Sequence, residues 1–236
     1  MASDLRSGRS FASNLVMPSI FRDRQAAGVQ LAAELAPYAN DPAVLVLGLP
    51  RGGVPVAYEV ARALHAPLDV FVVRKLGVPG HRELAMGAIA SGGVRVLNRD
   101  VIDSLQISAP ILDAVAAYEQ TELERQQRAY RDDVPFPNLA GRTVIIVDDG
   151  LATGSTMRAA VRALRQSRPA RIVVAVPVGA ADTCRSLRDE ADKVVCAIVP
   201  RDFHAVSLWY NEFSQTTDQE VRSLLEAAAT HNASAR

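Results

Sequence analysis

The sequence predicts an α/β protein with an open parallel sheet and helices on both faces. Strand-sized runs that are continuously apolar, rather than alternating, are typical of parallel strands buried on both sides. Such runs lie at residues 44–49, 68–73, 143–147, 171–176 and 193–199. Segments with helical spacing of apolar residues separate most of these runs, and this order favours a sheet covered by helices.

The helical segments follow from periodicity and from start and stop signals. They cover residues 21–38, 54–64, 155–166, 180–190 and 218–229. Asp100 and Ser108 are the expected N-caps of a short helix and of a long helix that runs from Pro110 to about Tyr130. Residues 74–83 are polar and contain glycine, which predicts a loop, and residues 85–90 and 94–97 predict a short hairpin around a Gly-Gly turn.

Length and composition limit the function classes. The 236 residues suit one large domain, and 26 Lys and Arg balance 26 Asp and Glu, so no net charge attracts nucleic acid. The apolar runs are far shorter than a membrane helix, so a soluble protein without a membrane partner is expected. Cys184 and Cys196 are too few and too widely spaced for a disulfide framework or a zinc site, which suits a reducing cytoplasm.

The chain divides into three predicted parts. Residues 1–20 form a loose arm, residues 21–199 form the core with a long helical segment at 108–131, and residues 200–236 form a small C-terminal hood and helix. The second half of the long helix is polar, with Glu124 and Arg128 at the spacing of a solvated pair. This helix could pack on another chain, so one hypothesis is a structural homodimer.

A strand that runs directly into an acidic pair and a glycine loop is the strongest functional signal. The segment 144–156 reads VIIVDDGLATGST. Gly150 and Gly154 let several backbone N–H groups converge on one anion at the start of the following helix. Asp148 and Asp149 would repel each other unless they accept hydrogen bonds or organise a cation, and a cis-diol supplies such donors.

Two other interpretations of this segment are available. The acidic residues could end the strand while the Gly-Ser sequence caps the helix, as is common in parallel folds. A strand that ends in two aspartates also occurs in nucleotide triphosphatases, yet the chain contains no Gly-x-x-x-x-Gly-Lys-Ser/Thr sequence to accompany it.

Residues 144–156 closely resemble the 5-phosphoribosyl 1-pyrophosphate binding motif of type I phosphoribosyltransferases. The order of elements over residues 44–199 is similar to that family's Rossmann-like core, which carries a flexible β-hairpin loop and a small hood. The resemblance implies that Asp148 and Asp149 bind the ribose hydroxyls and that Leu151 is a spacer. It implies a 5-phosphate site made by Ala152, Thr153, Gly154, Ser155 and Thr156.

The resemblance also assigns the groups around the leaving pyrophosphate. Arg51, Gly52 and Gly53 would form the pyrophosphate loop, although glycine turns after strands are also common structural punctuation. Arg74 and Lys75 are the expected catalytic cations, at the start of a loop that closes over the substrate. The same residue types could form a solvated charge pair.

The acceptor is less well defined by the sequence. In the family, enzymes for 6-oxopurines carry an acid at the position of Ala152, so this residue resembles the adenine type more closely. Phe203, Trp209 and Tyr210 in the predicted hood could stack on a planar base. They could equally form a core patch beside the last helix.

The resulting hypothesis is a phosphoribosyltransferase of nucleotide salvage with two small-molecule substrates. It would use Mg²⁺, held mainly through the substrate, with Asp148 and Asp149 contributing through water. The alternative is a regulatory protein that binds phosphoribosyl pyrophosphate without turnover. A regulator of this kind usually carries a nucleic-acid surface, and neither a basic stretch nor a helix-turn-helix pattern is found in the sequence.

Overall fold

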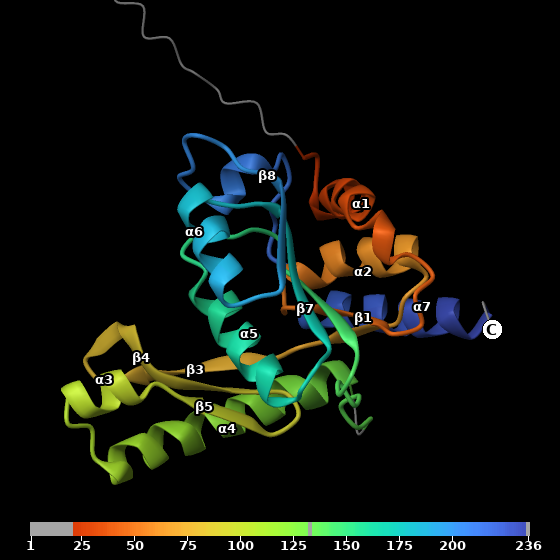
Figure 1. Ribbon diagram of the computed structural model, residues 1–236. Coiled ribbons are helices and arrows are strands. Elements are labelled where there is room, and N and C mark those ends of the chain that lie inside the picture. The colour runs from red at the N-terminus through yellow and green to blue at the C-terminus, as the bar shows by residue number, and fades with distance from the viewer. Residues whose placement is uncertain (1–20, 132–133, 235–236) are drawn as a thin grey trace, which may run out of the picture.

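The centre of the protein is a five-stranded parallel sheet (Figure 1). The computed structural model describes residues 21–131 and 134–234. The strands are ordered β2-β1-β6-β7-β8 and all neighbours run parallel. Their bounds are Val44–Gly48 for β1, Leu68–Val70 for β2, Thr143–Val147 for β6, Arg171–Val178 for β7 and Lys193–Ile198 for β8. The predicted fold class is confirmed.

Alternate side chains of each central strand enter two different cores, one on each face of the sheet. In β6, Val144 and Ile146 pack with α5 (Ser155–Gln166) and α6 (Ala181–Ser186). Ile145 and Val147 pack on the opposite face with residues of α1 (Arg24–Glu34) and α2 (Gly53–Leu64). All four side chains are fully buried, which is why the strand is apolar without a break.

A second, antiparallel sheet lies beside the first and consists of β3 (Val73–Val78), β4 (His81–Ala90) and β5 (Val94–Leu97). Helix α3 (Arg99–Ser104) follows β5, and the long helix α4 (Ala109–Arg131) packs against β3 and β4. The hairpin predicted at 85–97 is therefore correct but incomplete. The loop predicted over residues 74–83 is wrong, because these residues form β3 and the start of β4. Leu76, Val78 and Met86 become buried against α4, and this burial favours the strands.

Two further details of the helices differ from the sequence expectations. The cap of α3 is Asn98, whose side chain accepts from the Val101 N–H, so Asp100 lies in the first turn instead. The helix predicted over residues 180–190 is shorter, because α6 ends at Ser186 and a 3₁₀ turn, η2 (Leu187–Asp189), follows it. None of the helices in the described ranges combines the length and the apolar character needed to cross a membrane.

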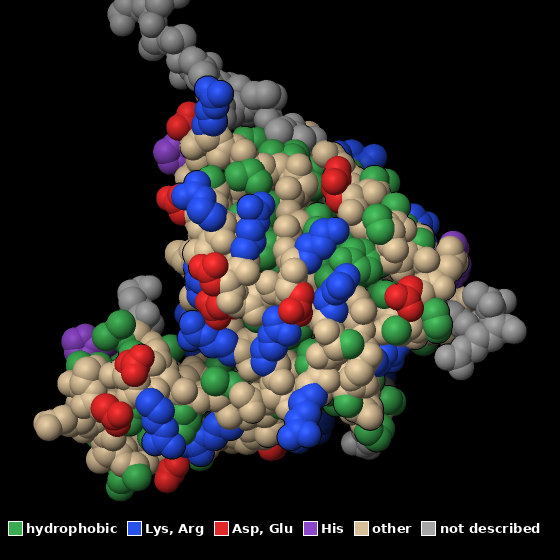
Figure 2. All heavy atoms as spheres, in the orientation of Figure 1, with side chains coloured by type: hydrophobic (Ala, Val, Ile, Leu, Met, Phe, Trp, Pro, Cys, Tyr) green, Lys and Arg blue, Asp and Glu red, His purple; other side chains and the backbone are tan. Residues whose placement is uncertain are grey.

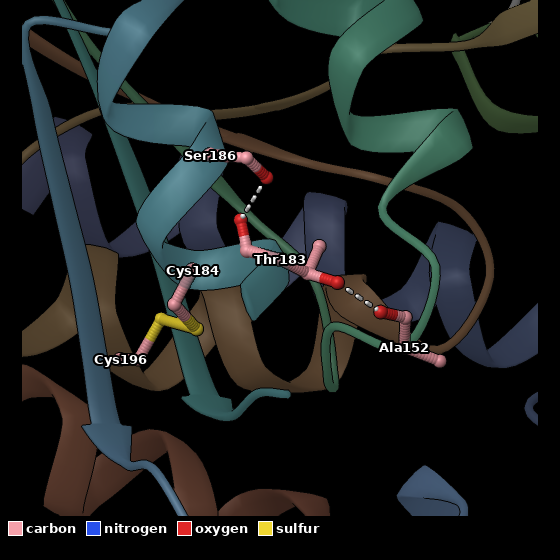
Figure 3. The surroundings of a disulfide bond; sticks show 5 residues. All are labelled: Ala152, Thr183, Cys184, Ser186 and Cys196. Carbon is pink, nitrogen blue, oxygen red and sulfur yellow. Dashed lines mark hydrogen bonds between the residues drawn. A yellow bond between two sulfur atoms is a disulfide. The ribbon is translucent and has the colours of Figure 1, made fainter. Parts of the chain in front are cut away.

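Cys184 of α6 and Cys196 of β8 form a disulfide (Figure 3). The sequence predicts no disulfide framework, and nothing in the spacing of the two cysteines indicates this bond. The two residues are 12 positions apart, and their Cα atoms lie 6.8 Å from each other. They meet because α6 packs directly on β8, the strand that follows it in the chain.

The C-terminal residues form a 3₁₀ turn, η3 (Val206–Trp209), and a final helix, α7 (Asp218–Ser234). Helix α7 packs against α2 and α4. The predicted arm at 1–20 lies outside the described residues, and the division between core and hood stays a prediction. Both acidic and basic side chains lie on the face shown in Figure 2, in keeping with the equal counts of the two.

Candidate functional site

The two glycine loops singled out in the sequence meet in the structure. Strands β1 and β6 are neighbours, so the turn after Gly48 and the acidic pair after Val147 leave the same edge of the sheet. A Cβ on Gly52 would fall on Oδ2 of Asp149, and a Cβ on Gly53 would come within 2.7 Å of the Val147 carbonyl oxygen. The peptide bond between Pro50 and Arg51 is cis. Only glycine allows the two loops to approach this closely.

Replacing Gly53 by alanine is expected to lower the free energy of unfolding by about 1–3 kcal/mol, the usual cost of overpacking a tight site. The added methyl would also lie 2.9 Å from the Asp148 Cα, so backbone would have to move. Gly77→Ala in β3 is the matched control, because its Cβ would meet nothing within 4 Å. Chemical denaturation of both variants measures the difference, and equal stabilities would contradict the close approach.

The acidic pair is partly enclosed at the end of β6. Burial raises the pKa of Asp148 well above its ordinary value, and the neighbouring Asp149 charge raises it further. Burial also raises the pKa of Asp149, against the opposing effect of Arg24. Asp148 Oδ1 accepts a hydrogen bond of 2.9 Å from the backbone N–H of Asp149. Burial thus outweighs the partners of both carboxyl groups and disfavours their charged forms, which suits a site that binds hydroxyl donors or a cation.

Arg24 is a site residue that sequence reasoning did not find. Its Nε donates to Asp149 Oδ2 at 2.8 Å, and both side chains are largely buried, at 12% and 15% exposure. The guanidinium also donates to the Ser214 carbonyl at 2.7 Å and lies 3.9 Å from the centre of the Phe213 ring. Arg24 thus joins α1, the acidic pair and the C-terminal segment. No motif marks it, because 125 residues separate it from Asp149.

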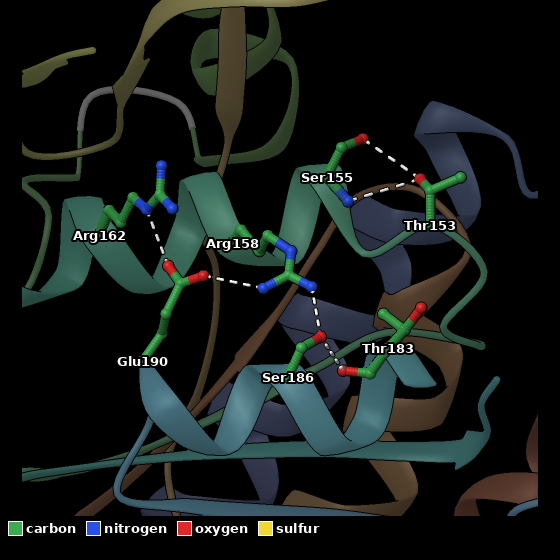
Figure 4. Close-up of polar contacts among 7 residues, drawn as sticks. All are labelled: Thr153, Ser155, Arg158, Arg162, Thr183, Ser186 and Glu190. Carbon is green, nitrogen blue, oxygen red and sulfur yellow. Dashed lines mark hydrogen bonds and ion pairs between the residues drawn. The ribbon is translucent and has the colours of Figure 1, made fainter. Parts of the chain in front are cut away.

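The predicted phosphate loop, residues 150–156, leads into the first turn of α5 (Figure 4). Gly154 has a φ of 73°, a left-handed conformation that favours glycine, and its Cβ would collide with Thr183. The Thr183 hydroxyl donates to the Ala152 carbonyl at 2.7 Å, which ties α6 to the loop (Figure 3). Ala152, Thr153, Ser155 and Thr156 are exposed, so the loop presents its donors to solvent. This geometry suits an anion.

The structure places the side chains of the predicted cations, Arg74, Lys75 and Arg51, at different sites. Neighbouring residues of a strand point to opposite faces, so Lys75 and Arg74 separate. Lys75 Nζ donates to Ser155 Oγ at 3.3 Å and therefore lies at the phosphate loop. Arg74 forms an ion pair of 2.6 Å with Glu119 of α4 and is not brought to the loop. Arg51 lies 3.9 Å from Asp218 of α7.

The predicted acceptor aromatics form a core patch for the most part. Trp209 and Tyr210 are 8% and 5% exposed and pack with Phe21 and Val178. Phe203 is only partly buried against the same cluster. The Tyr210 hydroxyl donates to the Asp149 backbone carbonyl at 2.5 Å. Tyr210 therefore holds the backbone of the acidic pair in place. The rings of Trp209 and Tyr210 are therefore not available to stack on a base in this arrangement.

The described residues contain no cluster of three or more His, Cys, Asp or Glu side chains that could hold a metal ion. The acidic pair supplies at most two carboxylates. Mg²⁺ is commonly bound by one or two carboxylates, with substrate oxygens and water as its other ligands. The site therefore fits a metal that arrives with a phosphorylated substrate, and it does not fit a metal held by protein ligands alone.

Comparisons with known proteins agree with this geometry. Residues 80–210 match the family model described as "Phosphoribosyl transferase domain". The chain is 49% identical over 212 residues to the Mycobacterium tuberculosis H37Rv protein named "Putative phosphoribosyl transferase Rv0571c", and the match covers 89% of this chain and 47% of that protein. The chain thus spans about half the length of this relative.

A more distant relative and one solved structure extend the comparison. The bifunctional protein PyrR of Roseiflexus sp. is 34% identical over 125 residues, or 51% of this chain and 62% of that protein. The crystal structure of TT1426 from Thermus thermophilus superposes with a TM-score of 0.76 at 43% identity. That superposition covers 87% of this chain and 97% of the other.

Proposed function

Because the chain belongs to the phosphoribosyl transferase domain family, we propose that it transfers a phosphoribosyl group from 5-phosphoribosyl 1-pyrophosphate to a nitrogenous acceptor. One observation carries this proposal. Gly52 closes onto the carboxylate of Asp149, so the anion loop after β6, the acidic pair and the glycine turn after β1 form one site. A ribose that bears a phosphate at one end and a pyrophosphate at the other needs these three elements side by side.

The ribose would lie over the acidic pair. Asp148 and Asp149 accept hydrogen bonds from its 2′ and 3′ hydroxyls, and bonds to charged acceptors are stronger than neutral ones. The exposed amides and hydroxyls of residues 152–156 hold the 5-phosphate, and Lys75, bonded to Ser155, adds a positive charge beside them. The backbone of Gly52 and Gly53, together with Arg51, faces the pyrophosphate.

Displacement of pyrophosphate at C1 would pass through a state with oxocarbenium character, in which negative charge grows on the leaving group. Mg²⁺ bound through the substrate and the acidic pair would offset that charge. The chain itself orients the sugar through Asp148 and Asp149, and the adjacent positive groups stabilise the departing phosphates. Arg24 opposes the effect of burial and so favours the ionised form of Asp149, while the Tyr210 hydroxyl donates to the backbone carbonyl of the same residue.

Incubation with phosphoribosyl pyrophosphate, Mg²⁺ and a panel of nucleobases and simple amines tests the proposal. We expect pyrophosphate release that depends on one acceptor and falls by about a hundredfold or more in Asp148→Asn/Asp149→Asn, as loss of several charged interactions implies. Reactions without acceptor measure competing hydrolysis. Tight binding of phosphoribosyl pyrophosphate without release for any acceptor would contradict an enzyme and favour a regulatory protein that senses this ligand.

A further inference from the structure

A groove with a volume of about 500 Å³ lies between the antiparallel sheet and α5. We call it the hairpin groove. Its walls come from β4, β5 and α3 on one side and from α5 on the other. It begins at Lys75 and Ser155, beside the phosphate loop, and runs along α5 toward Arg162, away from the acidic pair. In Figure 2 the lobe that carries these strands stands apart from the body of the molecule, and Lys and Arg side chains border the indentation.

The two walls of the hairpin groove differ in character. The wall formed by β4, β5 and α3 is mostly apolar and includes Leu84, whose side chain is 42% exposed, with Val96, Leu97 and Val101 beside it. An exposed leucine in a concave surface is typical of a ligand site, because such a side chain gains from being covered. This wall suits the flat face of a ring.

Most of the charged residues that line the groove, on α3 as well as on α5, are cationic. Lys75, Arg99, Arg158 and Arg162 line the groove together with one acidic residue, Asp100. Glu190 of the neighbouring turn binds Arg158 at 2.9 Å and Arg162 at 2.7 Å, so one carboxylate serves two arginines (Figure 4). The cations therefore outnumber the carboxylates, and the groove is net positive. A charge-assisted bond from this lining to an anion would be favourable.

Two of the arginines retain unused donors. Arg162 bonds Glu190 through Nε, and no bond of its terminal nitrogens is found among the described residues. Arg99 is exposed and makes no ion pair with any residue in the described part of the chain. A planar guanidinium with open terminal nitrogens matches a phosphate group well.

From the volume, the apolar wall and these donors, we infer that the hairpin groove binds a small molecule with a planar ring and a phosphate, of the nucleoside 5′-monophosphate class. Sites for ligands of this size usually measure about 300–1,000 Å³. The ring would cover the apolar wall, and the phosphate would bond Arg99 and Arg162. This inference goes beyond the proposed function, because the groove extends away from the acidic pair and its occupation requires no transfer reaction.

Calorimetric titration with adenosine and uridine 5′-monophosphates, the matching nucleosides and inorganic phosphate tests the inference. The titrations use Asp148→Asn/Asp149→Asn, which removes the ribose contact of the proposed active site. The phosphate loop is unchanged in this and every variant below, so a change in binding between variants reports on the groove. We expect one nucleotide to bind at least about tenfold more tightly than its nucleoside or phosphate, which corresponds to about 1.4 kcal/mol. Adding Arg99→Ala and Arg162→Ala should remove that preference, whereas the exposed pair Arg185→Ala and Arg188→Ala should not.

A variant that blocks the groove without changing its charge tests whether the nucleotide binds inside it. Ala159→Phe fills the groove from α5 without changing any charge, and it should also abolish nucleotide binding. Thermal unfolding confirms that each variant is folded. Absence of nucleotide binding, a nucleotide that binds no better than phosphate, or binding unaffected by Ala159→Phe would each overturn the inference. None of these results bears on pyrophosphate release, so failure here is distinct from failure of the proposed function.

Discussion

Replacing Asp148 and Asp149 together by asparagine is expected to weaken the binding of phosphoribosyl pyrophosphate by about a hundredfold or more. Each carboxylate would accept a ribose hydroxyl, and a hydrogen bond to a charged group contributes about 1.5–3 kcal/mol. Loss of two such bonds corresponds to at least two factors of ten at about 1.4 kcal/mol each. Calorimetric titration in the presence of Mg²⁺ measures the change.

The same substitution should leave the fold intact. Because burial raises the pKa of Asp148 above 3.8, this carboxyl favours folding most at pH below that value and loses this contribution as the pH rises through its raised pKa. The substitution also replaces the carboxylate partner of the largely buried Arg24 by a neutral amide, so we expect a lower melting temperature with the cooperative unfolding transition retained. Asp182→Asn/Asp189→Asn, at exposed positions, is the control for charge alone. Equal affinity in the native protein and the Asp148/Asp149 variant would refute the assigned sugar contact.

Replacing Arg24 by methionine is expected to weaken phosphoribosyl pyrophosphate binding by about tenfold at pH 7, the effect of losing one charge-assisted bond in a partly buried site. Arg24 opposes the effect of burial on the pKa of Asp149. Without it that pKa rises, so Asp149 becomes protonated at a higher pH. Since the ligand requires the ionised form, affinity should fall as the pH is lowered, and the fall should begin at a higher pH than in the native protein.

Titrations at several values from about pH 5 to pH 8 measure this shift. Arg22→Met is the matched control, because Arg22 is 69% exposed and pairs with Asp23 rather than with the acidic pair. Arg24→Lys keeps the charge but loses the planar stack on Phe213 and should give an intermediate profile. Parallel pH profiles for the native protein and Arg24→Met would show that Arg24 has only a structural role.

The elements with the clearest local signals were predicted well. β6 and α5 have the bounds expected from the sequence, because a continuous apolar run and a glycine turn into an amphipathic helix leave few alternatives. Residues 74–83 were predicted to be a loop, because their charges and glycines outweigh Leu76 and Val78 in a short window. These two side chains are buried in a cluster that includes residues of α4, which lies more than 30 residues further along the chain.

In the candidate site, too, features set by neighbouring residues could be predicted, whereas features set by distant residues could not. The acidic pair and the phosphate loop follow one another in the chain, so their association could be predicted. Arg74 and Lys75 are adjacent as well, yet the strand turns Arg74 toward Glu119 and Lys75 toward Ser155. The aromatic residues Trp209 and Tyr210 gave no local sign of whether they face a ligand or the core.

The sequence by itself determined the parallel α/β architecture, the family and the loop that would hold a phosphate, because each depends on residues close together in the chain. The tertiary structure alone decided that Gly52 closes onto Asp149, that Arg24 holds this carboxylate and that Cys184 pairs with Cys196. It also created the hairpin groove between α5 and the antiparallel sheet. The physical reason is that the charge, burial and packing of these groups depend on partners from distant parts of the chain, which only the folded sheet brings within a few ångströms.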